Sequence, residues 1–104
     1  MTVLDRAHFD RMTGADRALQ AEVVGLFRAQ AEGWTAACDG GDGWRAAVHT
    51  MKGSARGIGL TALAAACEAA ETAPETEIVA ALAAVRAALN DALAALEQFA
   101  AEAA

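Results

Sequence analysis

The chain has little of what builds β-sheets. Among its 104 residues there is no tyrosine, aromatic residues amount to 5%, and proline occurs once. Alanine, the best helix former, supplies about a third of the sequence, whereas the β-branched and aromatic residues that favour strands are sparse. The composition therefore predicts an all-α protein, and the length is that of a single domain covering residues 1–104.

Cysteine is also scarce, and its placement does not suggest a cysteine-based site. Cys38 and Cys67 form no CxxC pattern, and both lie in alanine-rich stretches that we expect to face the core. Reduced, buried thiols are the favoured interpretation, with a disulfide as the alternative. His8 has no companion ligand at a spacing typical of metal sites, so we expect no bound metal.

Positive charge and long apolar runs are lacking as well. The net charge is −6 and only eight residues are Lys or Arg, which disfavours binding to nucleic-acid phosphates. No uninterrupted apolar stretch approaches the roughly 18 residues of a membrane span, and Asp5, Arg6 and Asp10 interrupt the N-terminus. We therefore expect a cytoplasmic protein that binds neither nucleic acid nor membrane.

Turn-forming residues divide the chain into one short and four longer helices. Breaks are expected at Thr13-Gly14, the glycine-rich segment 39–43, Gly57-Ile58-Gly59 and Thr72-Ala73-Pro74. The predicted helices cover residues 5–12, 16–38, 42–57, 60–71 and 75–102. Because short connections force consecutive helices to run antiparallel, the pattern predicts an up-down-up-down four-helix bundle with a short N-terminal capping helix.

Helical periodicity predicts which faces form the core. In the first helix the expected core residues are Leu4, Phe9 and Met12. The second helix, after a predicted Thr13-x-x-Asp16 cap, has an apolar face of Leu19, Val23, Phe27, Trp34 and Cys38. The last has a near-heptad seam of Ile78, Leu82, Val85, Leu89, Leu93, Leu96 and Phe99.

The third helix carries the residues most suited to chemistry. Its apolar positions share one face, composed of Trp44, Val48, Met51, Ala55 and Ile58. His49 lies off this face and is expected to be exposed. Within about 60° on one side of it lie three basic residues: Arg45, Lys52 and Arg56. On the other side lie residues with almost no side chain: Ala46, Gly53 and Gly57.

This arrangement favours phosphoryl chemistry at His49 over an ordinary surface histidine. Gly53 costs a helix about 1 kcal/mol relative to alanine, so its presence suggests a compensating role such as clearance for a partner. An exposed imidazole is substantially neutral near physiological pH, and its unprotonated nitrogen is a nucleophile. Phosphoryl transfer needs mainly in-line positioning and nearby positive charge, which Lys52 can supply. Arg45 and Arg56 either steer an acidic partner or only solvate the helix.

The run His49-Thr50-Met51-Lys52-Gly53-Ser54-Ala55, followed by Gly59, closely resembles the signature of histidine-containing phosphotransfer (HPt) domains. Segment 13–16, Phe27 and Cys67-Glu68 also resemble that family, so the resemblance covers almost the whole chain. It implies a four-helix bundle, phosphorylation of His49 on Nε2, and an electrostatic supporting role for Lys52. It also implies no cofactor on this chain, because the Mg²⁺ used during transfer belongs to the partner receiver domain.

Two departures from the family pattern concern the site. Met51 replaces the usual leucine, a volume-conserving change that should leave the site intact. Between Phe27 and His49 the chain is shorter than typical relatives, so the docking surface on the second helix does not carry over directly. Gln30 resembles a family position that hydrogen-bonds the active imidazole, with a simple boundary residue as the alternative.

The resemblance implies a phosphorelay intermediate without autokinase activity. Its expected partners are response-regulator receiver domains and the receiver domain of a hybrid histidine kinase. The alternative is a noncatalytic helical adaptor that binds and inhibits or scaffolds a receiver or kinase, and the intact His49, Lys52 and Gly53 argue against it. Another alternative, a kinase-type histidine bundle, builds its four helices from two chains, whereas this chain should suffice as a monomer.

Overall fold

The computed structural model describes residues 1–103, and this part of the chain is all-helical. The elements are α1 (Arg6–Thr13), α2 (Arg17–Ala37), α3 (Trp44–Ile58), α4 (Thr61–Thr72), the 3₁₀ turn η1 (Glu75–Glu77) and α5 (Ile78–Ala103). The largest difference from the predicted bounds is at the start of the last helix. There the Glu77 amide donates to the Pro74 carbonyl at 2.8 Å, so Glu75–Glu77 form a separate 3₁₀ turn ahead of α5.

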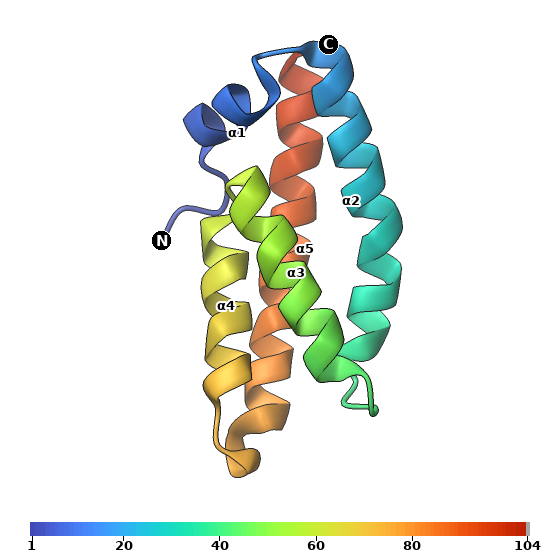
Figure 1. The fold of residues 1–104 in the computed structure, drawn as a ribbon, viewed down its shortest axis with the longest axis vertical. Helices are drawn as coiled ribbons and strands as arrows, with labels where there is room; N and C mark the ends of the chain where they lie inside the picture. The colour runs from blue at the N-terminus through green and yellow to red at the C-terminus, as the bar shows by residue number, and fades with distance from the viewer. Residues whose placement is uncertain (104) are drawn as a thin grey trace.

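The long helices pack side by side. Figure 1 shows that the chain passes along the long axis of the molecule in alternating directions, through α2, α3, α4 and α5 in turn. Each of these helices contacts the next one along the chain, and α2 also contacts α5. The short α1 lies near one end of the assembly and contacts α3 (Figure 1). The arrangement leaves α3 with one face toward the interior and the opposite face in solvent.

The core follows the predicted periodicity closely in α3 and α5. All five residues of the predicted α3 face are buried, with Val48, Met51 and Ala55 fully inaccessible. In α5 the buried residues are Leu82, Val85, Leu89, Ala92, Leu96 and Phe99, whereas Ile78 and Leu93 are only partly buried. At the α1 end Phe9 packs edge-on against Phe99, with ring centroids 5.1 Å apart.

The first half of α2 is rotated relative to the prediction. Leu19 is 40% exposed and Val23 is only partly buried, whereas Gln20 and Val24 face inward. The Gln20 amide donates to Asp10 Oδ1 at 2.8 Å and to the Thr13 hydroxyl at 3.0 Å, both on α1. These hydrogen bonds satisfy a buried polar side chain, so the packing of α1 fixes the rotation of α2.

Two further expectations about the α1 region are wrong. Met12 is 43% exposed instead of buried, and Thr13 takes the buried position. The predicted Thr13-x-x-Asp16 cap does not form, because Thr13 is the last residue of α1 and its hydroxyl donates to the Phe9 carbonyl at 2.8 Å. Asp16 itself is the N-cap of α2 and accepts from the Leu19 amide at 3.1 Å.

The turn between α3 and α4 requires glycine. Gly59 ends α3 with φ of 98°, a left-handed conformation that other residues rarely adopt. A β-carbon at this position would lie 3.0 Å from the Asp5 carbonyl oxygen and 3.1 Å from the His8 ring. The Gly59 carbonyl in turn accepts from the Asp5 amide at 2.8 Å, which anchors the N-terminal segment on this turn.

The segment Glu75–Glu102, which spans η1 and α5, is long and apolar enough to cross a membrane by length and composition alone. Core helices of globular proteins can pass the same test. Here Leu82, Val85 and Leu89 are buried against the neighbouring helices, and many exposed positions of α5 are alanine. Only 22% of the apolar window is buried, so its hydropathy comes from one buried stripe of large residues together with many exposed alanines.

Leu89→Ala is expected to lower the free energy of unfolding by about 2 to 5 kcal/mol, because the leucine is fully buried and its removal leaves a cavity. Leu93→Ala is the matched control on the same helix, and its loss should be smaller because Leu93 is only partly buried. Urea denaturation of both variants measures the difference. Equal losses would contradict the burial pattern of α5.

Candidate functional site

His49 stands on the solvent side of α3. Its neighbour Val48 is fully buried, and the helical repeat turns the next side chain outward, so the His49 side chain is 71% exposed. The helical spacing of the apolar residues predicted this exposure of His49. The surface beside His49 is completed by α4, which packs against α3 and contributes Glu68 and Glu71.

Glu71 contacts the His49 ring directly. Its Oε2 lies 3.2 Å from Nδ1 of His49. The pKa of Glu71 is lowered, first by its hydrogen bond with Lys52 and further by that with His49, against an opposing effect of desolvation. An ionised carboxylate only accepts hydrogen bonds, so this contact favours the ring form with the proton on Nδ1. The lone pair of the neutral ring is then on Nε2.

Lys52 is held by two carboxylates. Its Nζ lies 2.7 Å from Oε1 of Glu71 and 2.9 Å from Oε2 of Glu68, and its side chain is only 12% exposed. These contacts raise the pKa of Lys52, Glu71 having the larger effect. Lys52 is therefore a fixed charge one helical turn from His49, already ion-paired in the isolated protein.

The basic residues beside His49 have partners within the chain. Arg56 is 61% exposed and lies 3.7 Å from Glu68. The Arg45 guanidinium lies over the Trp44 ring at 4.4 Å from its centroid, a cation–π contact. Around His49 the charges of Lys52 and Arg56 are thus matched by two carboxylates of α4.

The other flank of His49 is open. Gly53 and Gly57 are both exposed, and a β-carbon built at either position would meet nothing within 4 Å. Neither glycine is therefore required by packing within the chain. A partner surface could approach the backbone of α3 closely at these positions.

Gln30 does not take the role that its position suggests. It is exposed, and within residues 1–103 it makes no hydrogen bond to His49. It lines a hollow of about 220 Å³ between α2 and α3, together with Met12, Val23, Leu26, Phe27, Ser54, Gly57 and Ile58. The ring partner is Glu71 instead, a residue to which the sequence pattern assigned no role. The available signal was the Glu68-x-x-Glu71 spacing, which places two carboxylates on one face of α4.

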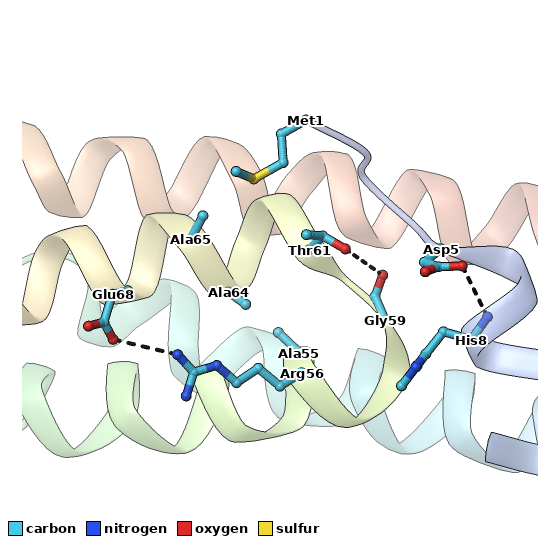
Figure 2. A pocket seen from close by; sticks show the side chains of 10 residues that line it. All are labelled: Met1, Asp5, His8, Ala55, Arg56, Gly59, Thr61, Ala64, Ala65 and Glu68. Carbon is cyan, nitrogen blue, oxygen red and sulfur yellow. Dashed lines mark hydrogen bonds and ion pairs between the residues drawn. The ribbon is translucent and has the colours of Figure 1, made fainter. Parts of the chain in front are cut away.

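A second hollow, of about 390 Å³, lies between the N-terminal segment, the end of α3 and α4 (Figure 2). Figure 2 shows Arg56 extending from α3 toward Glu68 of α4 at the edge of this hollow. The Nε2 atom of His8 lies 3.0 Å from the Gly57 carbonyl oxygen, so this histidine has a structural contact with the end of α3. Glu68 therefore belongs both to this hollow and to the ion pairs beside His49.

The cysteines are buried free thiols. Burial is the main cause that raises the pKa of Cys67 to about 12, which keeps it protonated and unreactive near neutral pH. Within the described part of the chain, no group of three or more His, Cys, Asp or Glu side chains could hold a metal ion. Of the predicted site residues, the structure gathers His49 and Lys52, with Arg56 at the edge, and adds Glu68 and Glu71.

Comparison with known protein families gives one match. The sequence model of the Hpt domain matches residues 10–99, which includes all of α2 to α4, the second half of α1 and most of α5. Searches of curated proteins and of solved structures gave no match. Because the match covers most of the chain and includes His49, the chain belongs to the Hpt domain family.

Proposed function

We propose that this chain is a histidine phosphotransfer protein that shuttles a phosphoryl group between receiver-domain aspartates by way of His49. Hpt domains are phosphocarrier modules of two-component signalling and interact with receiver domains and histidine kinases. The observation that carries the proposal is the exposed His49 ring, whose Nδ1 contacts Glu71 and whose Nε2 has no hydrogen-bond partner among residues 1–103.

The proposed transfer is a direct displacement at phosphorus. The Nε2 lone pair attacks the phosphorus of a receiver aspartyl phosphate in line, the N–P bond forms, and the P–O bond to the aspartate breaks. The electron pair of that bond remains on the aspartate as a carboxylate. The reverse reaction delivers the group to a second receiver. The Mg²⁺ that offsets phosphoryl charge is expected on the receiver, so we propose neither a cofactor nor autokinase activity on this chain.

Charge near the ring supports the proposal. Lys52 places a fixed positive charge one turn from His49, where it can offset charge on the transferring group. Arg56 is exposed and can steer an acidic receiver surface, and Arg45 on the same side of α3 has the same sign.

The surface next to His49 supports receiver docking. Gly53 and Gly57 leave the α3 backbone accessible, and Met12 and Leu26 are exposed apolar residues at the hollow between α2 and α3. Exposed apolar surface of this kind is typical of protein interaction sites. We therefore propose that a receiver covers the α2–α3 side of His49. We further propose that the chain acts in the cytoplasm as a monomeric, antiparallel four-helix bundle.

The test is to incubate the protein with a panel of phosphorylated receiver domains from the same genome and follow acid-labile label. At least one receiver should transfer label to the chain, and light scattering coupled to size exclusion should give the mass of one chain. Binding of a receiver without any transfer of label would instead favour the noncatalytic adaptor. A protein that assembles only as a dimer would favour the two-chain histidine bundle.

A further inference from the structure

We propose that Glu68 is a positioning residue that competes with the phosphoryl group on His49 for nearby cations, and thereby limits how strongly the chain retains that group. The cations are Lys52 and Arg56. The inference deepens the proposed function and rests on it, because the competition begins only when His49 is phosphorylated. Glu68 acts through the two cations, since within residues 1–103 it makes no hydrogen bond or ion pair to the His49 ring.

One oxygen of Glu68 contacts both cations. Its Oε2 accepts from Nζ of Lys52 at 2.9 Å and lies 3.7 Å from a guanidinium nitrogen of Arg56. Figure 2 shows the Arg56 side chain extending from α3 toward this carboxylate. Lys52 and Arg56 are four residues apart and therefore lie on successive turns of one side of α3. Glu68 thus holds the positive charge that a phosphoryl group on His49 would use.

The charges beside His49 are balanced before any phosphoryl group arrives. Lys52 and Arg56 contribute two positive charges. Glu68 and Glu71 contribute two negative charges. A phosphoryl group on a side chain adds roughly 1.5 to 2 negative charges near neutral pH. It therefore repels the Glu68 carboxylate and attracts the cations that this carboxylate holds.

Glu68 is the carboxylate that the cations can leave. Its side chain is 52% exposed, whereas that of Glu71 is 24% exposed and also contacts the His49 ring. An exposed ion pair contributes little to stability, because water competes for both charges. The Arg56 side chain is itself exposed, so its guanidinium can turn from Glu68 toward phosphoryl oxygens without disturbing the core.

The competition sets the balance between keeping and releasing the phosphoryl group. When the group passes to a receiver, the N–P bond breaks, its electron pair returns to Nε2, and a P–O bond to the aspartate forms. Lys52 and Arg56 then regain Glu68 as their partner, which favours the released state. While the group is on His49, the Glu68 carboxylate lies near like charge, which disfavours the phosphorylated state. A chain without this carboxylate should therefore hold the phosphoryl group more tightly.

The test is the equilibrium distribution of label between the chain and a receiver that exchanges phosphoryl groups with it. Glu68→Gln keeps the size of the side chain and removes its charge. The equilibrium constant should shift toward the labelled chain by about 3- to 10-fold, as Coulomb's law gives for one charge removed at an exposed site. Because salt screens exposed charges, the difference from wild type should shrink at about 1 M salt. A purely structural effect of the substitution would not depend on salt in this way.

Glu97→Gln is the matched control, because Glu97 is also an exposed glutamate in an ion pair, with Arg28 between α2 and α5. The substitution makes the same change of net charge, and its equilibrium constant should equal that of wild type. An unchanged or lowered constant in Glu68→Gln would overturn the proposal. An equal increase in both variants would overturn it as well, since net charge alone would then explain the shift.

A measurement without receivers separates this proposal from the proposed function. His49 is phosphorylated with phosphoramidate, a small-molecule phosphoryl donor, and the side-chain carboxylate ¹³C resonances are followed by NMR. The Glu68 resonance should shift as its cations turn to the phosphoryl group, and the Glu97 resonance should stay in place. If no receiver exchanges label yet Glu68 responds in this way, the proposed function fails while the competition stands. An unshifted Glu68 resonance would overturn the competition, and exchange of label with receivers would still support the proposed function.

Discussion

His49→Ala is expected to abolish acceptance of acid-labile label from a phosphorylated receiver while the fold remains intact. The side chain is 71% exposed and lies off the buried face of α3, so its removal leaves no cavity in the core. It does remove the nitrogen to which the phosphoryl group would be attached. Labelling followed by gel autoradiography, together with a circular dichroism melt of the same sample, measures both effects.

The matched control is His8→Ala, which removes the only other histidine of the chain. The His8 ring contacts the Gly57 carbonyl at the end of α3, so some loss of stability is expected, but labelling should persist. Label on His49→Ala comparable to wild type would show that another residue accepts the group. Loss of label in both variants together would point to a requirement for the fold of α3 rather than for His49 itself.

Gly53→Gln is expected to have opposite effects on stability and on transfer. Glutamine is a better helix former than glycine, and a β-carbon at Gly53 meets nothing within 4 Å, so the free energy of unfolding should rise by up to about 1 kcal/mol. Transfer from a phosphorylated receiver should nevertheless fall to background, because the new side chain occupies the flank of α3 over which the partner must pack. The label transferred after a series of fixed times measures the transfer rate, and urea denaturation measures the free energy of unfolding.

Two variants control for this substitution. Gly53→Ala should gain similar stability but lose less transfer, because its side chain is a single methyl group. Ala84→Gln adds the same side chain as Gly53→Gln at an exposed position of α5 and should transfer like wild type. Unchanged transfer in Gly53→Gln would mean that the glycine is not kept for partner clearance.

Local sequence signals predicted the helices and the exposure of His49. The five apolar residues of α3 repeat at helical spacing, and this spacing alone fixes both the buried face and the direction of His49. Alanine abundance and a few glycine-rich breaks placed the helix ends to within three residues. Pro74 gave the largest error, because the chain after it forms a 3₁₀ turn before α5 begins.

Features set by contacts between helices could not be read from the same signals. The rotation of early α2 depends on Gln20, whose burial is favourable only because α1 supplies Asp10 and Thr13 as partners. An apolar pattern assigns Leu19 to the core and a glutamine to the surface, so it predicts the wrong rotation of α2 about its axis. The hydrogen bonds across the two helices decide otherwise.

The same reason explains what was missed at the site. Glu71 is 22 residues beyond His49, and the two meet only because α4 packs against α3. Lys52 was correctly placed near His49, but its ion pairs with Glu68 and Glu71 required knowledge of the neighbouring helix. Gln30 was predicted to bond the His49 ring from its resemblance to a family position. In the structure it lines the hollow between α2 and α3, and Glu71 contacts the ring.

The most direct test of the account is to locate the phosphoryl group on the wild-type chain after transfer from a receiver, by ³¹P and ¹⁵N NMR of the labelled protein. The account predicts one phosphoryl group, bonded to Nε2 of His49, with the proton of that ring on Nδ1. A phosphoryl group on Nδ1, on His8 or on any other residue would contradict it.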